Sequence, residues 1–146
     1  MLLGRDDVNP DKPDNNGRTP LLYEAVNGHE EVVKVLLKRG EVNPNKPALR
    51  GETPLCRAAS IGHAGVVKIL VGRDDLKPDE PDHAGLTPLW HAASAGHEAV
   101  VKILLGRSDV NPNKPQLWRA VARGHVGVME LLLRLHESAT PGVARG

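Results

Sequence analysis

Residues 82–105 read DHAGLTPLWHAASAGHEAVVKILL, and three short blocks within this stretch return elsewhere in the chain. Its Thr-Pro-Leu block, residues 87–89, also stands at residues 19–21 and 53–55. The Gly-His and Val-Val-Lys blocks that follow return with the same step of 34 residues. An internal period of this length indicates a stack of repeated structural units, none of which buries its apolar face alone.

Each block has a physical role in a pair of antiparallel helices. Thr87 is able to cap free N–H groups of a first helical turn, and Pro88 loses no hydrogen bond at the first helical position. Gly96 follows eight residues later, where glycine readily adopts the left-handed conformation that ends a helix. Apolar residues at helical spacing then predict a second helix with one buried face. In the first repeat, the residues expected on this face are Val32, Val33, Leu36 and Leu37.

The period predicts three complete repeats and a shortened fourth. In chain order they cover residues 14–47, 48–81, 82–115 and 116–137. The fourth lacks six residues, because its Gly-His block comes 28 residues after the preceding one. Residues 1–13 match only the end of a repeat, so we expect a partial helix there and a chain that begins inside a longer array. Residues 138–146 read as a flexible tail.

Proline-punctuated connectors join the repeats. In the first connector, Asn16-Gly17 favours a tight turn with positive φ, so we expect a short β-hairpin-like finger to project from each complete repeat. Because successive units must stack to bury their helices, we expect one all-α domain, a solenoid of helix-turn-helix units, over residues 1–137.

The combined pattern resembles the ankyrin repeat, in which Asp-x-x-Gly-x-Thr-Pro-Leu precedes two small residues, Gly-His, Val-Val-Lys and a Leu-rich end. The third repeat fits it best, at Asp82, Gly85, Thr87, Pro88, Leu89, Ala92, Ala93, Gly96, His97, Val100, Val101, Lys102, Leu104 and Leu105. The resemblance covers nearly the whole chain and implies a solenoid that binds partner proteins. The connectors, with Asn-Pro-Asp/Asn-Lys-Pro, resemble those of long fungal ankyrin arrays, including arrays attached to NTPase-type receptor proteins.

Several positions depart from the family pattern. The family often has a helix-ending glycine after the second helix, and only Gly40 preserves it. Glu24 stands where the third repeat has Ala92, and we expect it to be tolerated because that face lacks a preceding repeat and stays wet. A polar outer face, as an end cap requires, is expected in the fourth repeat from Arg119, Arg123, Glu130 and Arg134.

Composition excludes several classes of partner. Nineteen basic and eighteen acidic side chains leave a formal charge of +1, so no large field attracts nucleic acid or an anionic membrane. The longest apolar runs are far too short to span a bilayer, and no leader precedes the first repeat. We expect a soluble protein without nucleic-acid or membrane partners. The single cysteine, Cys56, fits a reducing compartment, so we expect the cytoplasm or the nucleus.

Recurrent histidines raise the question of a metal site. Four of the seven histidines, His29, His63, His97 and His125, recur in register. Stacked helices lie about 8–10 Å apart, whereas two ligands of one zinc lie about 4 Å apart. We therefore assign these four side chains to bonds with the inter-helix turns and expect no metal.

Nothing in the sequence points to catalysis or a cofactor. The repeat equivalents of Cys56 are Leu22 and Trp90, which are packing residues, and a thiol buried in an apolar site is inert. The chain also lacks a phosphate-binding glycine loop and a cysteine-based zinc spacing. We expect neither catalytic residues nor a cofactor, and no enzymatic activity.

Partner contacts are expected where the repeats differ from one another, on the concave surface of the fingers and first helices. By position, the resemblance implies binding roles for Asn15, Asn16, Arg18, Tyr23, Asn27, Leu49, Arg50, Glu52, Arg57, Ile61, His83, Ala84, Leu86, His91, Ala95, Arg119 and Arg123. Tyr23, Arg50 and Arg57 are the strongest candidates, since Tyr and Arg are common in binding hot spots. The alternative is that these residues vary because nothing constrains a solvated surface.

Two functions stay open at this point. The chain is either a protein-protein interaction module or an inert spacer, which includes an excised or engineered fragment of a longer array with no ligand of its own. We expect a monomer, with end-to-end association as an alternative because both ends of the stack expose a repeat face.

Overall fold

A computed structural model describes residues 9–112, 115–121 and 125–138. Most of the partial helix expected over residues 1–13, and nearly all of the tail expected over 138–146, lie outside this description. The described chain forms eight helices: α1 (Pro20–Asn27), α2 (Glu30–Leu37), α3 (Pro54–Ile61), α4 (Ala64–Val71), α5 (Pro88–Ala95), α6 (Glu98–Leu105), α7 (Pro115–Val121) and α8 (Val126–Ser138).

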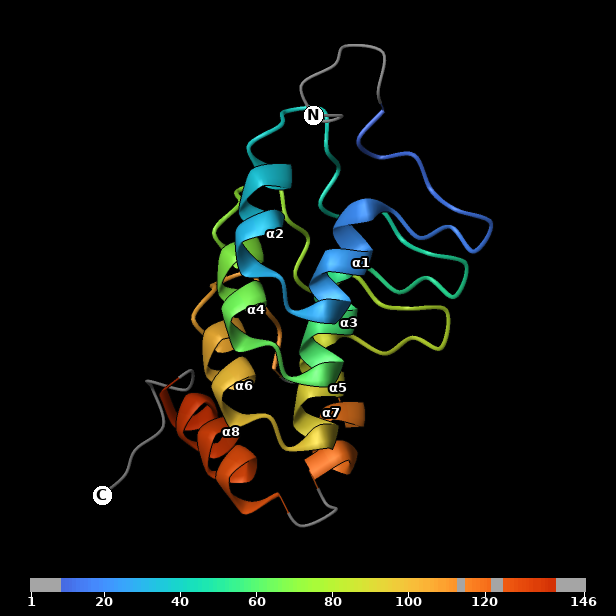
Figure 1. The fold of residues 1–146 in the computed structure, drawn as a ribbon. Helices are drawn as coiled ribbons and strands as arrows, with labels where there is room; N and C mark the ends of the chain where they lie inside the picture. Colours follow the sequence, from blue (N-terminus) through green and yellow to red (C-terminus); the bar gives the residue numbers. More distant parts are fainter. Residues whose placement is uncertain (1–8, 113–114, 122–124, 139–146) are drawn as a thin grey trace, which may run out of the picture.

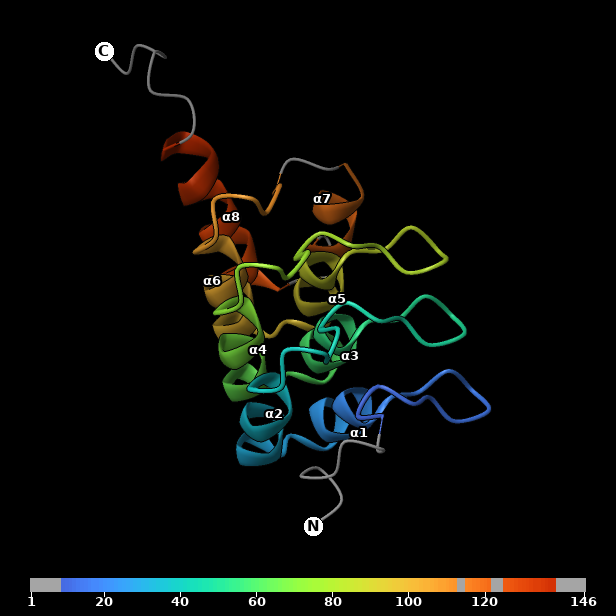
Figure 2. The same cartoon turned by 90° about the horizontal axis from the view of Figure 1, so that it is seen from above.

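These helices lie in two rows (Figure 1). The odd-numbered helices form one row and the even-numbered helices the other, and each contacts its neighbour in the next repeat. Three loops project side by side from the odd-numbered row (Figure 2). The chain is therefore an all-helical solenoid with three fingers, as the period predicts.

The first helix of each complete repeat begins and ends as the sequence predicts. Thr53 is extended, and its Oγ1 accepts the N–H of Cys56 at 3.1 Å. Thr19 and Thr87 cap α1 and α5 in the same way. Each of these helices has eight residues and ends at a left-handed glycine, which in α3 is Gly62, at a φ of 93°. The caps give each helix its start and stop.

The second helices end differently from the prediction. α2, α4 and α6 are followed by Lys38, Gly72 and Gly106, all in the right-handed conformation, and Gly40 does not have a positive φ. After α2 and α4 a left-handed glycine is unnecessary because arginine from the next repeat satisfies the helix end. Arg73 donates to the carbonyl of Leu37 at 2.7 Å, and Arg107 donates to that of Val71 at 3.1 Å.

The core consists of Leu, Val and Ala layers between the two rows. Leu21, Leu55 and Leu89 of the first helices are at most 1% exposed. The prediction of a buried Val32 is wrong, because its side chain is 41% exposed. Its equivalent in the next repeat, Val66, is 1% exposed, since another repeat packs beside it there. The described residues place no repeat against this side of α2.

Glu24 behaves as the sequence hypothesis requires. Its side chain is 27% exposed, and its carboxylate lies 2.5 Å from the His29 imidazole, so the charge is neither buried nor without a partner. At the other end of the stack, Arg119, Glu130 and Arg134 are exposed, as a polar cap requires. Arg123 lies outside the described residues.

Each finger is a short turn that closes on itself. In the first finger the N–H of Gly17 donates to the Asp14 carbonyl, and the N–H of Asp14 donates to the Arg18 carbonyl, both at 3.0 Å. Gly17 has a φ of 73°, as predicted. The described residues contain no β-strand, so the fingers are hairpin-like only in outline. Neighbouring fingers are joined by a backbone bond from Leu49 to Asn16 and another from His83 to Arg50.

Candidate functional site

A groove of about 550 Å³ lies between the first two fingers and helices α1 and α3. Its lining residues are Asn16, Arg18, Leu22, Tyr23, Val26, Ala48, Leu49, Arg50, Glu52 and Arg57. Seven of these ten were selected from the sequence as partner-binding positions, and they include all three of the strongest candidates. The fold thus gathers residues from two repeats into one concave site.

The side chains of the groove hold one another in place. The Tyr23 hydroxyl donates to Asp14 at the base of the first finger, and the Arg18 guanidinium lies 6.0 Å from the centre of the Tyr23 ring. In the second repeat, Arg57 forms an ion pair with Glu52 at 3.3 Å. These contacts connect each finger to the helix that follows it, so the groove is preorganised.

The groove carries more positive than negative charge. Three guanidinium groups, those of Arg18, Arg50 and Arg57, line it together with one carboxylate, that of Glu52. Asp14 lies nearby. The pKa of the Asp14 carboxyl is held below its ordinary value by the Tyr23 hydroxyl, the backbone N–H groups of the turn and the charge of Arg18. Among the described residues, Arg50 forms no ion pair, so its charge is available to a ligand.

Other predicted binding positions lie outside this groove. On the third finger His83 and Ala84 are exposed and Leu86 is partly buried, while Asn15 is exposed at the tip of the first. Asn27, Ile61 and Ala95 are exposed at the ends of the first helices, and Arg119 is exposed on α7. Arg123 falls outside the described residues. Partner binding at all of these positions stays a prediction.

Three of the four recurrent histidines bond across the repeat boundary rather than within their own turn. His63 Nε2 lies 2.9 Å from the Val26 carbonyl of the preceding repeat, and His97 and His125 make equivalent contacts with Ser60 and Ser94. Their role is structural, as predicted. The group that each one bonds to, however, is a carbonyl near the end of the first helix of the preceding repeat. His29 instead pairs with Glu24 of its own repeat.

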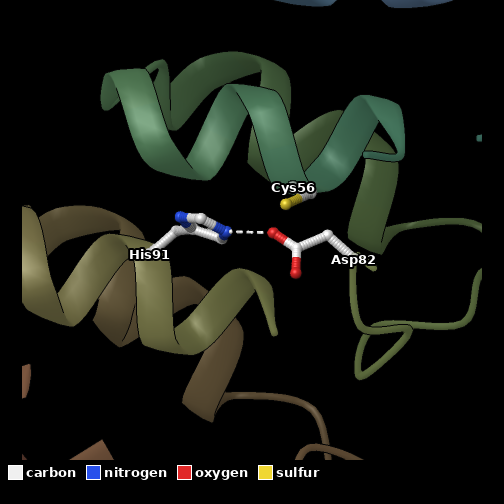
Figure 3. A group of neighbouring side chains, drawn as sticks. All are labelled: Cys56, Asp82 and His91. Atoms are coloured by element: carbon white, nitrogen blue, oxygen red, sulfur yellow. Dashed lines mark hydrogen bonds and ion pairs between the residues drawn. The ribbon is translucent and has the colours of Figure 1, made fainter. Parts of the chain in front are cut away.

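A second cluster of polar side chains joins the second and third repeats. Cys56 of α3, Asp82 at the start of the third finger and His91 of α5 lie together, and their donor atoms are all within 4.8 Å of one another (Figure 3). His91 Nε2 lies 2.9 Å from Asp82 Oδ2, and its side chain is only 20% exposed. His91 is thus less accessible to a partner than its place in the sequence suggests.

The surroundings of the Cys56 thiol disfavour its thiolate form. Cys56 is 1% exposed, and burial, together with the nearby carboxylates of Asp82 and Glu52, raises the pKa of the thiol to about 12. A thiol with this pKa carries almost no thiolate at neutral pH. The sequence-based expectation of an inert Cys56 agrees with this environment.

Comparison with known proteins gives the family. A family model described as ankyrin repeats matches three times, over residues 1–79, 40–116 and 75–141. A search of curated proteins finds no match. In the described part of the chain, no helix combines the length and the hydropathy needed to cross a membrane. Ankyrin repeats generally serve as protein-protein interaction modules, and from its repeat pattern, its fold and these matches the chain belongs to the ankyrin repeat family.

Proposed function

We propose that this protein binds a partner protein through the groove between its first two fingers and helices α1 and α3. The observation that carries the proposal is the convergence of seven variable sequence positions on one preorganised hollow. Binding in a family of this kind falls on positions that differ between repeats, whereas stacking residues stay fixed. The proposed role is recognition, without catalysis.

The shape and chemistry of the groove favour an extended peptide segment with acidic and apolar side chains. Leu49 is 64% exposed and Tyr23 42% exposed, so both offer apolar surface to a ligand. Arg18 and Arg50 line the same hollow and match carboxylates in bidentate geometry. A segment that places a carboxylate near these arginines and an apolar side chain against Leu49 satisfies both features.

Selection from a random peptide library tests this proposal directly. The full chain is immobilised, and selected peptides are expected to be rich in Asp or Glu beside an apolar residue. Reversing the groove charge with Arg18→Glu and Arg50→Glu is expected to abolish binding. The matched control reverses Lys34→Glu and Lys68→Glu, which are exposed on α2 and α4. The control keeps the same change in net charge and is expected to retain binding.

Four results would contradict the proposal. Equal loss of binding in both double variants means that net charge, not the groove, attracts the peptides. Selected peptides without acidic residues, or peptides that bind the groove variant as well as the wild type, mean that another surface is used. Failure to select any peptide favours the reading of the chain as an inert spacer or excised fragment.

A further inference from the structure

The second and third repeats meet at the cluster of Cys56, Asp82 and His91 (Figure 3). The three residues come from three separate elements: helix α3, the third finger and helix α5. Cys56 is 1% exposed, and the side chains of Asp82 and His91 are 9% and 20% exposed. The cluster therefore lies at the edge of the core, with His91 as its most exposed member.

Neighbouring groups orient the Asp82 carboxylate within the cluster. Its Oδ1 accepts the backbone N–H groups of Ala84 and Leu86, both at 3.0 Å. Its Oδ2 faces His91 Nε2 at 2.9 Å. Hydrogen bonds to the far oxygen of a liganding carboxylate are the usual means by which proteins position metal ligands. One carboxylate oxygen is thus fixed by the finger, and the other faces the imidazole and the thiol.

The donor set is that of a zinc site. Cysteine sulfur, histidine nitrogen and aspartate oxygen are the three protein ligands that Zn²⁺ takes. A thiolate and a carboxylate together supply two negative charges, which balance the ion in a largely buried place. We propose that Cys56, Asp82 and His91 bind one Zn²⁺ between the second and third repeats, with the fourth position left to water.

The observed geometry needs only a small adjustment. Ligands at about 2.0–2.3 Å from a tetrahedral Zn²⁺ lie about 3.3–3.7 Å from one another. The donor atoms here are separated by up to 4.8 Å. A side-chain shift of about 1 Å brings all three onto one ion, which then takes the place of the direct contact between Asp82 and His91.

No other described boundary carries this set. At the junction of the first and second repeats, the equivalents of Cys56, Asp82 and His91 are Leu22, Ala48 and Arg57, none of which is a zinc ligand. Donor residues therefore appear at all three positions at the second junction and at none of them at the first. A merely structural role for Asp82 needs only His91, as Asp14 needs only Tyr23 in the first repeat, and packing at position 56 does not require a thiol, since Leu22 and Trp90 stand at the equivalent positions.

Metal titration of the full chain, reduced and stripped of metal, tests the proposal. Zn²⁺ is added in a calorimeter, and Co²⁺ is used separately as an optical probe of thiolate ligation. We expect one ion per chain, a thiolate-to-cobalt absorption band, and release of the thiol proton, because the buried Cys56 thiol is protonated without metal. Zn²⁺ is also expected to raise the Tm of the chain, since only the folded state holds the three ligands together.

Matched variants locate the site. Loss of an outer partner of a metal ligand weakens binding about 10- to 100-fold, so Cys56→Ala, Asp82→Asn and His91→Gln are each expected to weaken Zn²⁺ binding at least as much. Asp82→Asn retains an oxygen for the finger N–H groups and so preserves the fold if the other variants unfold. Controls are Asp14→Asn, the same change in the first finger, and His83→Ala, an exposed histidine of the third finger. Both controls are expected to bind as the wild type does.

Two kinds of outcome overturn the proposal: an ion that binds elsewhere, and no ion bound at all. If wild type and Asp82→Asn bind Zn²⁺ equally, or if Co²⁺ binds without the thiolate band, the ion sits on surface histidines. If the reduced wild-type chain takes up no Zn²⁺ at all, the cluster is a structural contact only. Either outcome leaves the peptide groove untouched, because none of the three residues lines it.

Discussion

Gly62 shows how a single residue serves two repeats at once. Its φ of 93° ends α3, and the position of its missing Cβ lies 2.7 Å from Nδ1 of His97 in the next repeat. Gly85 on the third finger has a φ of 80°, but nothing lies within 4 Å of its Cβ position. A comparison of substitutions at these two glycines therefore separates the cost of backbone strain from the cost of steric overlap.

We predict that Gly62→Ala destabilises the protein more than Gly85→Ala does. Left-handed backbone costs an alanine about 1–2 kcal/mol at either position. Gly62→Ala additionally displaces the His97 ring and its bond to the Ser60 carbonyl, which costs about 1–3 kcal/mol more. Urea unfolding at constant pH measures both free energies. Equal losses for the two variants would show that the His97 contact gives way without cost.

At the scale of the element, the second helices α2 and α4 end in carbonyl groups that an arginine of the next repeat satisfies. Arg107 donates to the carbonyls of Val71 and Arg73 at 3.1 and 2.9 Å, and Asp109 orients it from 2.7 Å. Arg39 is paired with Glu41 in the same way, but bonds to no carbonyl of a preceding repeat among the described residues.

We predict that Arg107→Ala lowers the free energy of unfolding by about 1.5–3 kcal/mol, the usual range for a hydrogen bond to a charged group. Arg39→Ala is the matched control and is expected to cost less than about 1 kcal/mol, as exposed ion pairs do. Hydrogen exchange adds a local readout, because the amides of the last turn of α4 lose protection in Arg107→Ala. Equal losses of unfolding free energy in the two variants would contradict the role of Arg107 as a cap of the preceding helix.

Asp82 ties the stability of the third finger to pH. Desolvation by itself raises the pKa of this carboxyl. The Leu86 and Ala84 N–H groups and the His91 side chain outweigh it, so the pKa lies below the ordinary value. A depressed pKa in the folded state means that the stabilisation is complete above the unfolded value of about 3.9 and is lost as pH falls below it.

We therefore predict that the free energy of unfolding declines as pH falls from about 5 towards 2, and that Asp82→Asn flattens this decline. The measurement is urea unfolding at a series of pH values for both proteins without metal. A decline of the same steepness in the variant would assign the acid sensitivity to other carboxyls, such as Asp75 and Asp109, whose arginine partners also lower their pKa values.

On the scale of the whole molecule, the main contacts between the described helices lie within one repeat or between neighbouring repeats. The inner helices α3 to α6 have a repeat on either side, whereas α1 and α2 expose apolar residues such as Val32 and Val35. In such an array, stability is approximately a sum of repeat and interface contributions. The ends are therefore less stable than the middle.

We predict that amide hydrogen exchange is slowest in α3 to α6 and faster in α1, α2, α7 and α8. Partial opening from either end breaks one interface, whereas opening the centre breaks two. Exchange followed by mass spectrometry on peptic fragments resolves the four repeats. Uniform protection along the chain would instead indicate one cooperative unit.

The periodic part of this architecture is accessible from sequence because the same local chemistry recurs. Thr19, Thr53 and Thr87 each cap the start of a first helix, and a left-handed glycine ends each of these helices. The sequence does not by itself predict the arginine caps, although Arg39, Arg73 and Arg107 share the period. A charged residue after a helix is ordinarily expected to be solvated. The repeat period could have revealed the caps.

Non-periodic contacts were harder to predict for a physical reason. Cys56, Asp82 and His91 are separated by 26 and 9 residues, a spacing that fits no short motif, and they meet only because α3 and α5 stack. Likewise, the exposure of Val32 depends on what lies beside the first repeat rather than on its own helix. The seven groove positions were found from their variation, but which of them converge required the fold.

Most bonds between repeats have the same direction along the chain, with Asn45 of the first repeat as an exception, since its side-chain amide donates to the Asp75 carbonyl of the second at 2.8 Å. His63, Arg73 and the N–H of Leu49 belong to the second repeat, and each donates to a carbonyl of the first. The third repeat donates to the second in the same way through His97, Arg107 and the N–H of His83. Each repeat that leaves the ribosome thus brings its own donors to acceptors already in place, so the array is suited to assemble in the order of its synthesis.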